Sequence, residues 1–262
     1  MLLLLALLAF TACQNNQSDG ADSEDTSEEE MEDQEMNKYT LSPFSESTAY
    51  RNASLDGMTF EDGTFNFNYS NYELATQTPD AGTKMCANSD QGQHIHLIVD
   101  TQPYAAKYTG EFDYEIEDGE HYLMAFLSRS YHESIKNGNA HMAKKVTVAN
   151  NSITNEADIT EPMLFYSRPK GTYVGKANTD KVMLDFFLVN ADLGDDYMVQ
   201  ARIGEEVHMI DTWQPYYIEG LPMGETLITL TLVDKDGNAV DTPLNPVSRS
   251  ITLQADPADQ AM

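Results

Sequence analysis

The sequence predicts an all-β fold with two Ig-like β-sandwich domains, preceded by an apolar leader and a disordered acidic tether. Beyond residue 38, short runs rich in Thr, Val, Ile, Tyr and Phe are separated by turn residues about every eight to twelve positions. No stretch of this region keeps a helical period of apolar residues. A strand–turn–strand pattern also occurs twice along the chain, which favours two similar units.

The first twelve residues, MLLLLALLAFTA, are apolar or small, and Cys13 follows them directly. A transmembrane helix needs about 20 apolar residues, so this run fits the apolar core of a secretory signal instead. The arrangement resembles a bacterial lipobox, with Phe10 where that pattern usually has Leu. The resemblance implies that residues 1–12 are removed and that Cys13 is lipidated. The alternatives are a signal cleaved elsewhere and a buried N-terminal helix.

The segment after Cys13 is strongly acidic. Residues 14–36 contain ten Asp or Glu, no Lys or Arg, and no aromatic residue. Like charges and scarce apolar surface keep such a segment extended, so residues 13–38 are expected to form a disordered tether. The segment resembles the acidic stretches of surface lipoproteins of the Bacteroidota, and Gln14 is not the Asp associated with inner-membrane retention. The resemblance implies a lipid-anchored outer-membrane protein, facing the periplasm or the cell surface.

The rest of the chain is also acidic: 33 acidic and 15 basic residues leave a net charge of −18 outside the tether. This charge repels phosphate groups, so it excludes nucleic acid and anionic lipid head groups as partners. Cys13 and Cys86 are the two cysteines of the chain. If Cys13 carries lipid, Cys86 has no partner for an intramolecular disulfide.

Strand-like runs divide the chain into two sandwiches, at residues 39–150 and 162–256. Residues 151–161 (NSITNEADITE) are polar and lack aromatic side chains, which predicts a linker, and residues 257–262 are expected to be a tail. The predicted strands are 64–69, 93–100, 112–116, 121–129, 144–149, 182–190, 197–203, 206–211, 226–234 and 248–254.

The internal repeat supports this division. The residues DTQPY at 100–104 and DTWQPY at 211–216 each follow a strand, and a Gly-Glu step then opens a long strand at Gly119 and at Gly224. The pattern predicts duplicated Ig-like units. The alternative is that the same favourable turn chemistry is used twice, because Asp and Pro both favour turns.

The first unit carries a family resemblance. The residues GQHIHLIVD at 92–100 and the later Gly119-Glu-His121 resemble a family of small periplasmic Ig-like domains. That family shows a Gly-His-His-His-Leu-Leu-Ile-Asp strand and a Pro-Gly-Glu-His-Thr-Leu strand, and no activity is assigned to it. The likeness extends from Gly92 to about Val148, with departures at Gln93, Ile95 and Asp118. It implies a fold and no particular function.

The two histidines of this strand are the sharpest local feature. His94 and His96 are two residues apart, so both imidazoles lie on the same face of the strand. Together with His121 and Cys86 of the same unit they suggest a copper or zinc site. The alternative is that the histidines make hydrogen bonds across strands, that Cys86 is a small buried apolar residue, and that no cofactor is bound.

Aromatic residues near prolines form the second candidate site. Trp213, Tyr216 and Tyr217, with Tyr104 at the matching place of the first repeat, lie in predicted loops. Loop aromatics on a rigid scaffold are suited to a glycan or peptide ligand. The alternative is that these rings close the open end of a sandwich.

No catalytic motif is present: the chain has no Gly-x-Ser-x-Gly, His-Glu-x-x-His, phosphate loop or dinucleotide-binding glycine pattern. We therefore expect a non-catalytic outer-membrane lipoprotein that acts as a binding or adhesion module. Its expected partners are the membrane, through the lipid, and an envelope protein, peptide or glycan. The alternatives are a periplasmic metal-binding protein that uses His94 and His96, and a structural module of an envelope complex.

Overall fold

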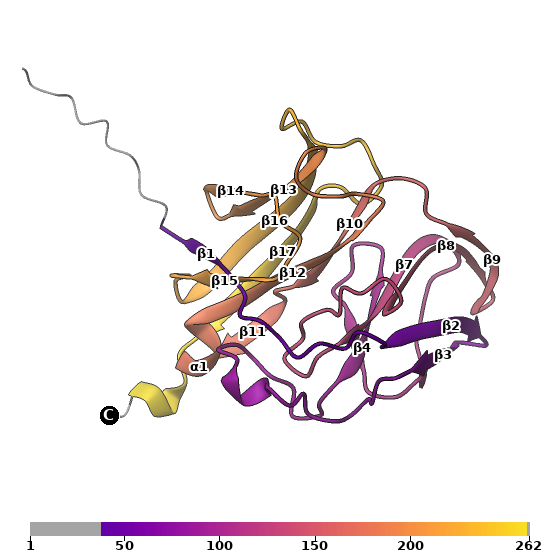
Figure 1. The fold of residues 1–262 in the computed structure, drawn as a ribbon, viewed down its shortest axis with the longest axis horizontal. Coiled ribbons are helices and arrows are strands. Elements are labelled where there is room, and N and C mark those ends of the chain that lie inside the picture. Colours follow the sequence, from indigo (N-terminus) through magenta and orange to yellow (C-terminus); the bar gives the residue numbers. More distant parts are fainter. Residues whose placement is uncertain (1–37, 261–262) are drawn as a thin grey trace, which may run out of the picture. The chain divides into compact units, whose positions relative to one another are not determined.

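The computed structural model describes residues 38–260, and Figure 1 shows their strands and short helices. The predicted signal peptide, Cys13 and nearly all of the predicted tether lie outside the described residues. The all-β prediction is confirmed, because four β-sheets account for almost all regular structure. The short helical elements are η1 (Ala81–Thr83), α1 (Lys176–Thr179) and η2 (Pro257–Gln260). In residues 38–260, helices long and apolar enough to cross a membrane are absent.

The first sandwich packs a three-stranded sheet, β2-β3-β6, against a five-stranded sheet, β5-β4-β7-β8-β9. All pairs in both sheets are antiparallel. Side chains that alternate along the strands fill the space between the sheets, including Phe60, Leu97 and Val146. The strands are β2 (Ser54–Glu61), β3 (Thr64–Ser70), β4 (His94–Val99), β5 (Ala105–Lys107), β6 (Glu111–Asp113), β7 (Gly119–Ser128), β8 (His141–Ala149) and β9 (Ser152–Asp158).

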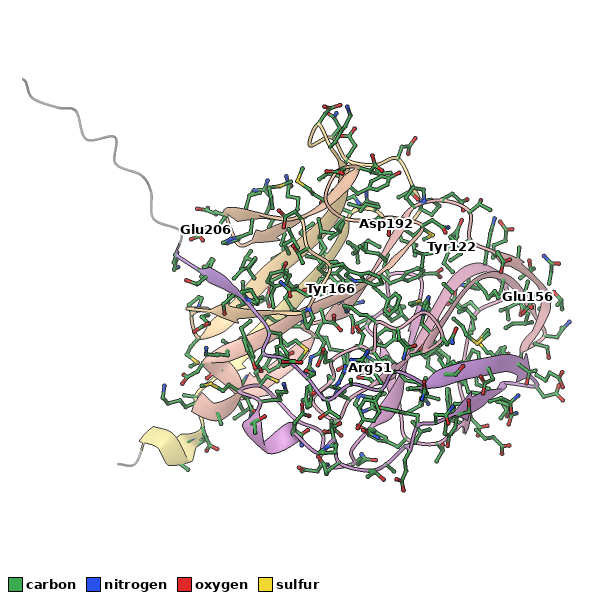
Figure 2. All side chains as sticks on the ribbon, in the orientation of Figure 1. Arg51, Tyr122, Glu156, Tyr166, Asp192 and Glu206 are labelled. Atoms are coloured by element: carbon green, nitrogen blue, oxygen red, sulfur yellow. The ribbon has the colours of Figure 1, made fainter. Side chains whose placement is uncertain are left out.

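The second sandwich packs the sheet β1-β15-β12-β10 against the sheet β11-β17-β16-β13-β14. Its core includes Leu184, Ile218 and Leu230, and Figure 2 shows Tyr166 inside it, whereas Asp192 is exposed. The strands are β1 (Thr40–Pro43), β10 (Met163–Arg168), β11 (Gly171–Val174), β12 (Lys181–Val189), β13 (Tyr197–Ile203), β14 (Glu206–Ile210), β15 (Tyr216–Glu219), β16 (Gly224–Asp234) and β17 (Val247–Gln254).

A third apolar cluster joins the two sandwiches. It brings Ile98 of β4 and Phe126 of β7 together with Phe165 of β10 and Phe187 of β12. Strand β4 is therefore covered on both faces, and every one of its six residues is buried. Ile95 and Leu97 face the core of the first sandwich, so His94 and His96 lie on the face shared with Ile98, toward the second sandwich.

Two predicted boundaries are wrong. Residues 151–161 do not form a linker, because β9 occupies most of them and pairs with β8 through a two-residue turn at Asn150 and Asn151. Asparagine tolerates the positive φ that this turn requires, and β9 is polar because it is an exposed edge strand. Strand β1, predicted within the first sandwich, instead pairs with β15 of the second.

The two copies of the repeated turn motif are not structurally equivalent. The residues 100–104 follow β4, which lies inside its sheet between β5 and β7. The residues 211–216 follow β14, which is the edge strand of its sheet. The Gly-Glu strands β7 and β16 do correspond, since each pairs with the next long strand of its sandwich. The turn sequence is thus used twice in different places on two similar sandwiches.

Candidate metal centre

Three histidine rings converge at the junction between the sandwiches. The Nε2 atom of His94 lies 2.8 Å from Nε2 of His96 and 3.0 Å from Nδ1 of His132. These three ligand atoms all lie within 4.8 Å of one another. His94 and His96 are fully buried on β4, and His132 comes from the turn after β7. His132 has a φ of 70°, a left-handed conformation in which Asn, Asp and His are the most frequent residues after glycine.

Hydrogen bonds to the far sides of two rings set their orientation. Nδ1 of His94 donates to the carbonyl oxygen of Gly92 at 2.8 Å, since a carbonyl can only accept. Nδ1 of His96 lies 3.3 Å from Oγ of Ser167, on β10. Histidines that bind metals usually donate their second ring N–H in this way to a carbonyl or another oxygen, which leaves the first nitrogen bare.

Gly92 is required at the start of this arrangement. Its φ is 89°, and a Cβ at this position would lie 2.6 Å from the backbone of Thr76. Glycine alone fits both the conformation and the close approach. The residue that places the carbonyl oxygen against His94 is therefore fixed by the backbone around it.

All three imidazoles are held in the neutral form. Burial lowers the pKa of His94 to about 4. The hydrogen bond that His94 donates to the Gly92 carbonyl opposes this shift, and the cations of Arg168 and Lys170 add to it. Burial is also the first cause that lowers the pKa values of His96 and His132 well below the usual range. Neutral imidazole is the form that binds a metal ion, so at pH 7 protons do not compete for these nitrogens.

Tyr104 connects the histidines to two cations. Its ring stacks on His96 with 3.6 Å between the centroids, and its Oη lies 3.2 Å from Nδ1 of His132. Nη1 of Arg168 donates to the same oxygen at 3.1 Å. Nζ of Lys170 lies 3.9 Å from the ring centroid of Tyr104 and donates to its backbone carbonyl at 2.6 Å.

His121 and Cys86 do not belong to the cluster, which corrects the predicted set. Nδ1 of His121 contacts Asp100 at 2.7 Å and Nε2 contacts the carbonyl of Glu117 at 2.8 Å, so both ring nitrogens are occupied. Cys86 packs against Phe44 and its neighbours, and burial raises the pKa of its thiol to about 12. A thiol that stays protonated is a poor metal ligand at neutral pH.

The third histidine of the cluster is His132, which sequence spacing did not select. It lies 36 positions after His96 in the chain, in a turn with no metal-ligand spacing to the strand pair. The sequence signal was limited to the presence of a further histidine in the same unit. The turn after β7 brings it to His94 because β7 is the antiparallel partner of β4.

The loop aromatics do not form an exposed platform, which contradicts the predicted ligand site. Tyr104, Tyr216 and Tyr217 are buried, and Trp213 is half-buried against Phe187. The indole N–H of Trp213 donates to the carbonyl of Phe186 at 3.0 Å. These rings fill the interior and the junction because each has both apolar neighbours and a polar partner within reach.

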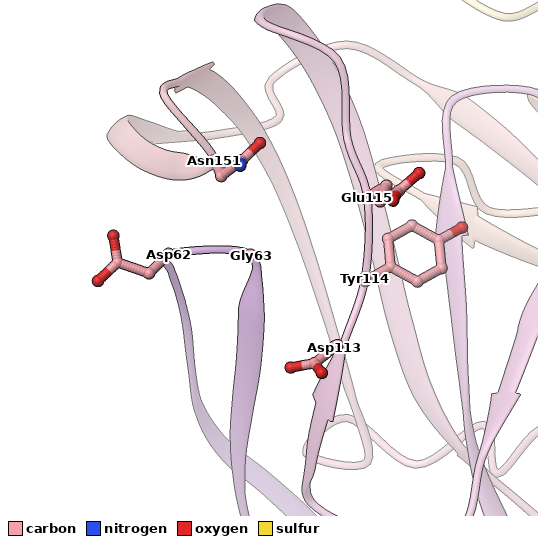
Figure 3. Close-up of a pocket in the computed structure, with 6 residues that line it drawn as sticks. All are labelled: Asp62, Gly63, Asp113, Tyr114, Glu115 and Asn151. Carbon is pink, nitrogen blue, oxygen red and sulfur yellow. The ribbon is translucent and has the colours of Figure 1, made fainter.

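A separate acidic pocket of about 650 Å³ lies at one end of the first sandwich (Figure 3). None of the three clustered histidines lines it; Asp62, Gly63, Asp113, Tyr114, Glu115 and Asn151 do. Backbone hydrogen bonds from Gly63 to Asn151 and from Tyr114 to Gly63 hold its walls together. Asp62 lies in the turn between β2 and β3, and Asp113 and Glu115 lie at and just after the end of β6.

No family model matches the chain, and no curated protein matches it. Among solved structures, the fibronectin(III)-like modules of CbhA from Clostridium thermocellum are 18% identical, with a TM-score of 0.29 over 36% of this chain and 98% of theirs. SGBP-B of the Bacteroides ovatus mixed-linkage glucan utilization locus, in complex with a mixed-linkage heptasaccharide, is 11% identical, with a TM-score of 0.19 over 83% of this chain and 47% of its own.

A Ca²⁺-stabilised, ice-binding adhesin of an Antarctic bacterium is 13% identical, with a TM-score of 0.23. That match covers 80% of this chain and 50% of the adhesin chain. This chain therefore spans half or less of the length of the last two proteins. Likeness at this level carries no information about what the chain binds.

Proposed function

We propose that the protein is a non-catalytic, lipid-anchored envelope protein that binds a copper or zinc ion through His94, His96 and His132. The observation that carries the proposal is that three ring nitrogens converge in a buried place. Nε2 of His94 lies 2.8 Å from Nε2 of His96 and 3.0 Å from Nδ1 of His132. The envelope location rests on the apolar leader and Cys13 of the sequence.

Hydrogen bonds among the histidines account poorly for this geometry. The Nδ1 proton of His94 is used by Gly92, so Nε2 of His94 carries one lone pair and no hydrogen. Two nitrogens approach that single lone pair, and only one can donate to it with good geometry. A metal ion at the centre would accept all three lone pairs and remove this conflict, taking the place of the Tyr104 hydroxyl at Nδ1 of His132.

The dimensions of the cluster approach those of such a site. Zinc binds imidazole nitrogen at about 2.0 to 2.1 Å, which places the nitrogens of a tetrahedral site about 3.3 Å apart. The two close contacts would each need to widen by a few tenths of an ångström, and the remaining pair of nitrogens, at up to 4.8 Å, would need to close by a turn of the His96 or His132 ring. Copper and zinc are the common ions that favour imidazole, and among residues 38–260 the site has no thiolate or carboxylate ligand.

Metal titration of the purified protein tests the proposal. Thermal unfolding is followed with Zn(II), with Cu(II), and with Cu(I) kept reduced by ascorbate, because a ligand of the folded state raises the melting temperature by mass action. We expect a shift that saturates at one ion per chain. Absence of a shift with every ion overturns the proposal.

A pair of histidine variants locates the ion. His132→Asn removes one ligand and suits the left-handed backbone, because asparagine tolerates positive φ. We expect this variant to lose the metal-induced shift. The matched control is His121→Asn, which removes an imidazole outside the cluster and should leave the shift intact. Equal binding by wild type and His132→Asn contradicts the assignment.

A second candidate is a structural module of an envelope complex, favoured by the burial of Tyr104, Tyr216 and Tyr217. Rings that fill the protein interior stabilise a rigid body and leave no aromatic surface for a glycan. A pull-down from solubilised envelopes with the intact lipoprotein tests this candidate. Recovery of one partner in stoichiometric amount supports it, and recovery of the lipoprotein alone argues against it.

A further inference from the structure

We infer that Arg168 and Lys170 make the three-histidine centre selective for a monovalent ion, Cu(I), over divalent Zn(II). The inference rests on the proposed function, because it names the ion that the same site prefers. Arg168 and Lys170 are not ligands of the proposed ion, and selectivity would account for their position beside it.

The first observation is that these cations lie close to the cluster. Oη of Tyr104 lies 3.1 Å from Nη1 of Arg168 and 3.2 Å from Nδ1 of His132. The guanidinium nitrogen is therefore no more than 6.3 Å from a ligand nitrogen. Nζ of Lys170 lies 3.9 Å from the ring centroid of Tyr104. The same ring stacks on His96, with 3.6 Å between the two ring centroids.

The second observation is that neither charge is neutralised. In residues 38–260 no carboxylate forms an ion pair with Arg168 or Lys170. Asp185, opposite Arg168 in the sheet, is engaged by Lys136 instead. Nε of Arg168 is buried without a hydrogen-bond partner.

The physical consequence depends on the charge of the bound ion. Repulsion between an ion and a fixed cation is proportional to the ion's charge, so a divalent ion meets twice the repulsion of a monovalent one. The low dielectric of a buried site strengthens the effect. Three neutral imidazoles contribute no negative charge to offset it, so the monovalent ion is favoured.

The test removes one charge and compares two ions. Competition titrations against chromophoric chelators give the affinities for Cu(I), under anaerobic ascorbate, and for Zn(II). Wild type is compared with Lys170→Gln and Lys170→Met, two neutral variants, so that poor folding of one leaves the other. Lys170→Arg keeps the charge, and Lys235→Gln removes the same charge from an exposed turn.

Because the repulsion doubles, the fold-change for Zn(II) should be the square of that for Cu(I). If a neutral variant binds Cu(I) about threefold more tightly, it should bind Zn(II) about tenfold more tightly. Lys170→Arg and Lys235→Gln should leave the ratio of the two affinities unchanged. Ag(I), which needs no reductant, should follow Cu(I).

Two results overturn this inference while the proposed function stands. The first is an equal change for both ions in the neutral variants. The second is a weaker Zn(II) affinity in them, which would indicate that Lys170 holds an anion bound to the metal. If wild type binds none of the ions, the proposed function fails, and the inference fails with it.

Discussion

Oγ of Ser167 lies 3.3 Å from Nδ1 of His96, although the two residues belong to different sandwiches. The second sandwich thus supplies the partner that orients a histidine of the first. The same residue of β10 accepts a hydrogen bond at its backbone oxygen from Arg249 of β17, at 3.0 Å. Nη2 of Arg249 also donates to the backbone carbonyl of Gln102 in the first sandwich, at 2.9 Å, so the docking of the sandwiches and the orientation of the candidate ligand involve the same short segment.

The first prediction is that Ser167→Ala weakens metal binding without unfolding the protein. Loss of the hydroxyl frees Nδ1 of His96 to take the other tautomer, and loss of such outer partners typically lowers metal affinity about tenfold or more. Competition titration measures the affinity, and circular dichroism checks the fold. Ser248→Ala, which removes an exposed hydroxyl bonded to Thr229, is the control and should leave affinity unchanged.

The second prediction concerns Gly92. Gly92→Ala should lower the free energy of unfolding by about 2 kcal/mol or more, because the new Cβ meets the Thr76 backbone and the positive φ is strained. Denaturant unfolding measures the loss. Gly138→Ala has open space around the new methyl group and should change stability by less than about 0.5 kcal/mol. Similar losses in both variants would contradict the close approach at Gly92.

Much of the fold could be predicted because strand patterns are local. The apolar alternation of 226–234 and the run at 182–190 correspond to β16 and β12 within two residues at each end. Strand β9 was missed because an exposed edge strand has the polar composition of a linker. The pairing of β1 with β15 joins residues more than 170 positions apart, which no local pattern encodes.

Part of the candidate site could also be predicted. The two-residue period of a strand predicts that His94 and His96 lie on one face, and their Nε2 atoms lie 2.8 Å apart. The choice of His121 failed because it lies at the other end of β7 from the cluster, where it pairs with Asp100. Its replacement, His132, depends on a turn conformation and on the junction of two sandwiches, both of which are tertiary properties.

The third prediction concerns the ion pair between Lys136 and Asp185, which are 2.5 Å apart. The Asp185 side chain is fully buried and also accepts a hydrogen bond from the Ser134 backbone, so Lys136→Met leaves a buried charge without its cation. We expect a loss of about 3 kcal/mol in unfolding free energy. The control is Lys144→Met, which breaks a 2.7 Å pair with the exposed Asp158 and should change the unfolding free energy far less.

The fourth prediction is a pH dependence at Asp80. Burial alone would raise the pKa of its carboxyl, but the Thr48 backbone N–H, Lys84 and the Tyr131 hydroxyl together hold the pKa below its usual value. A depressed pKa in the folded state contributes stability that is present above the unfolded value of 3.8 and is lost as the pH falls through the folded value. Asp80→Asn should therefore destabilise the protein by about 1 kcal/mol at pH 7, and by progressively less as the pH is lowered below 3.8. Urea unfolding across this pH range measures the difference in unfolding free energy between wild type and Asp80→Asn. The control is Asp192→Asn, at an exposed position. A difference that stays constant with pH would mean that the loss comes from packing instead of charge.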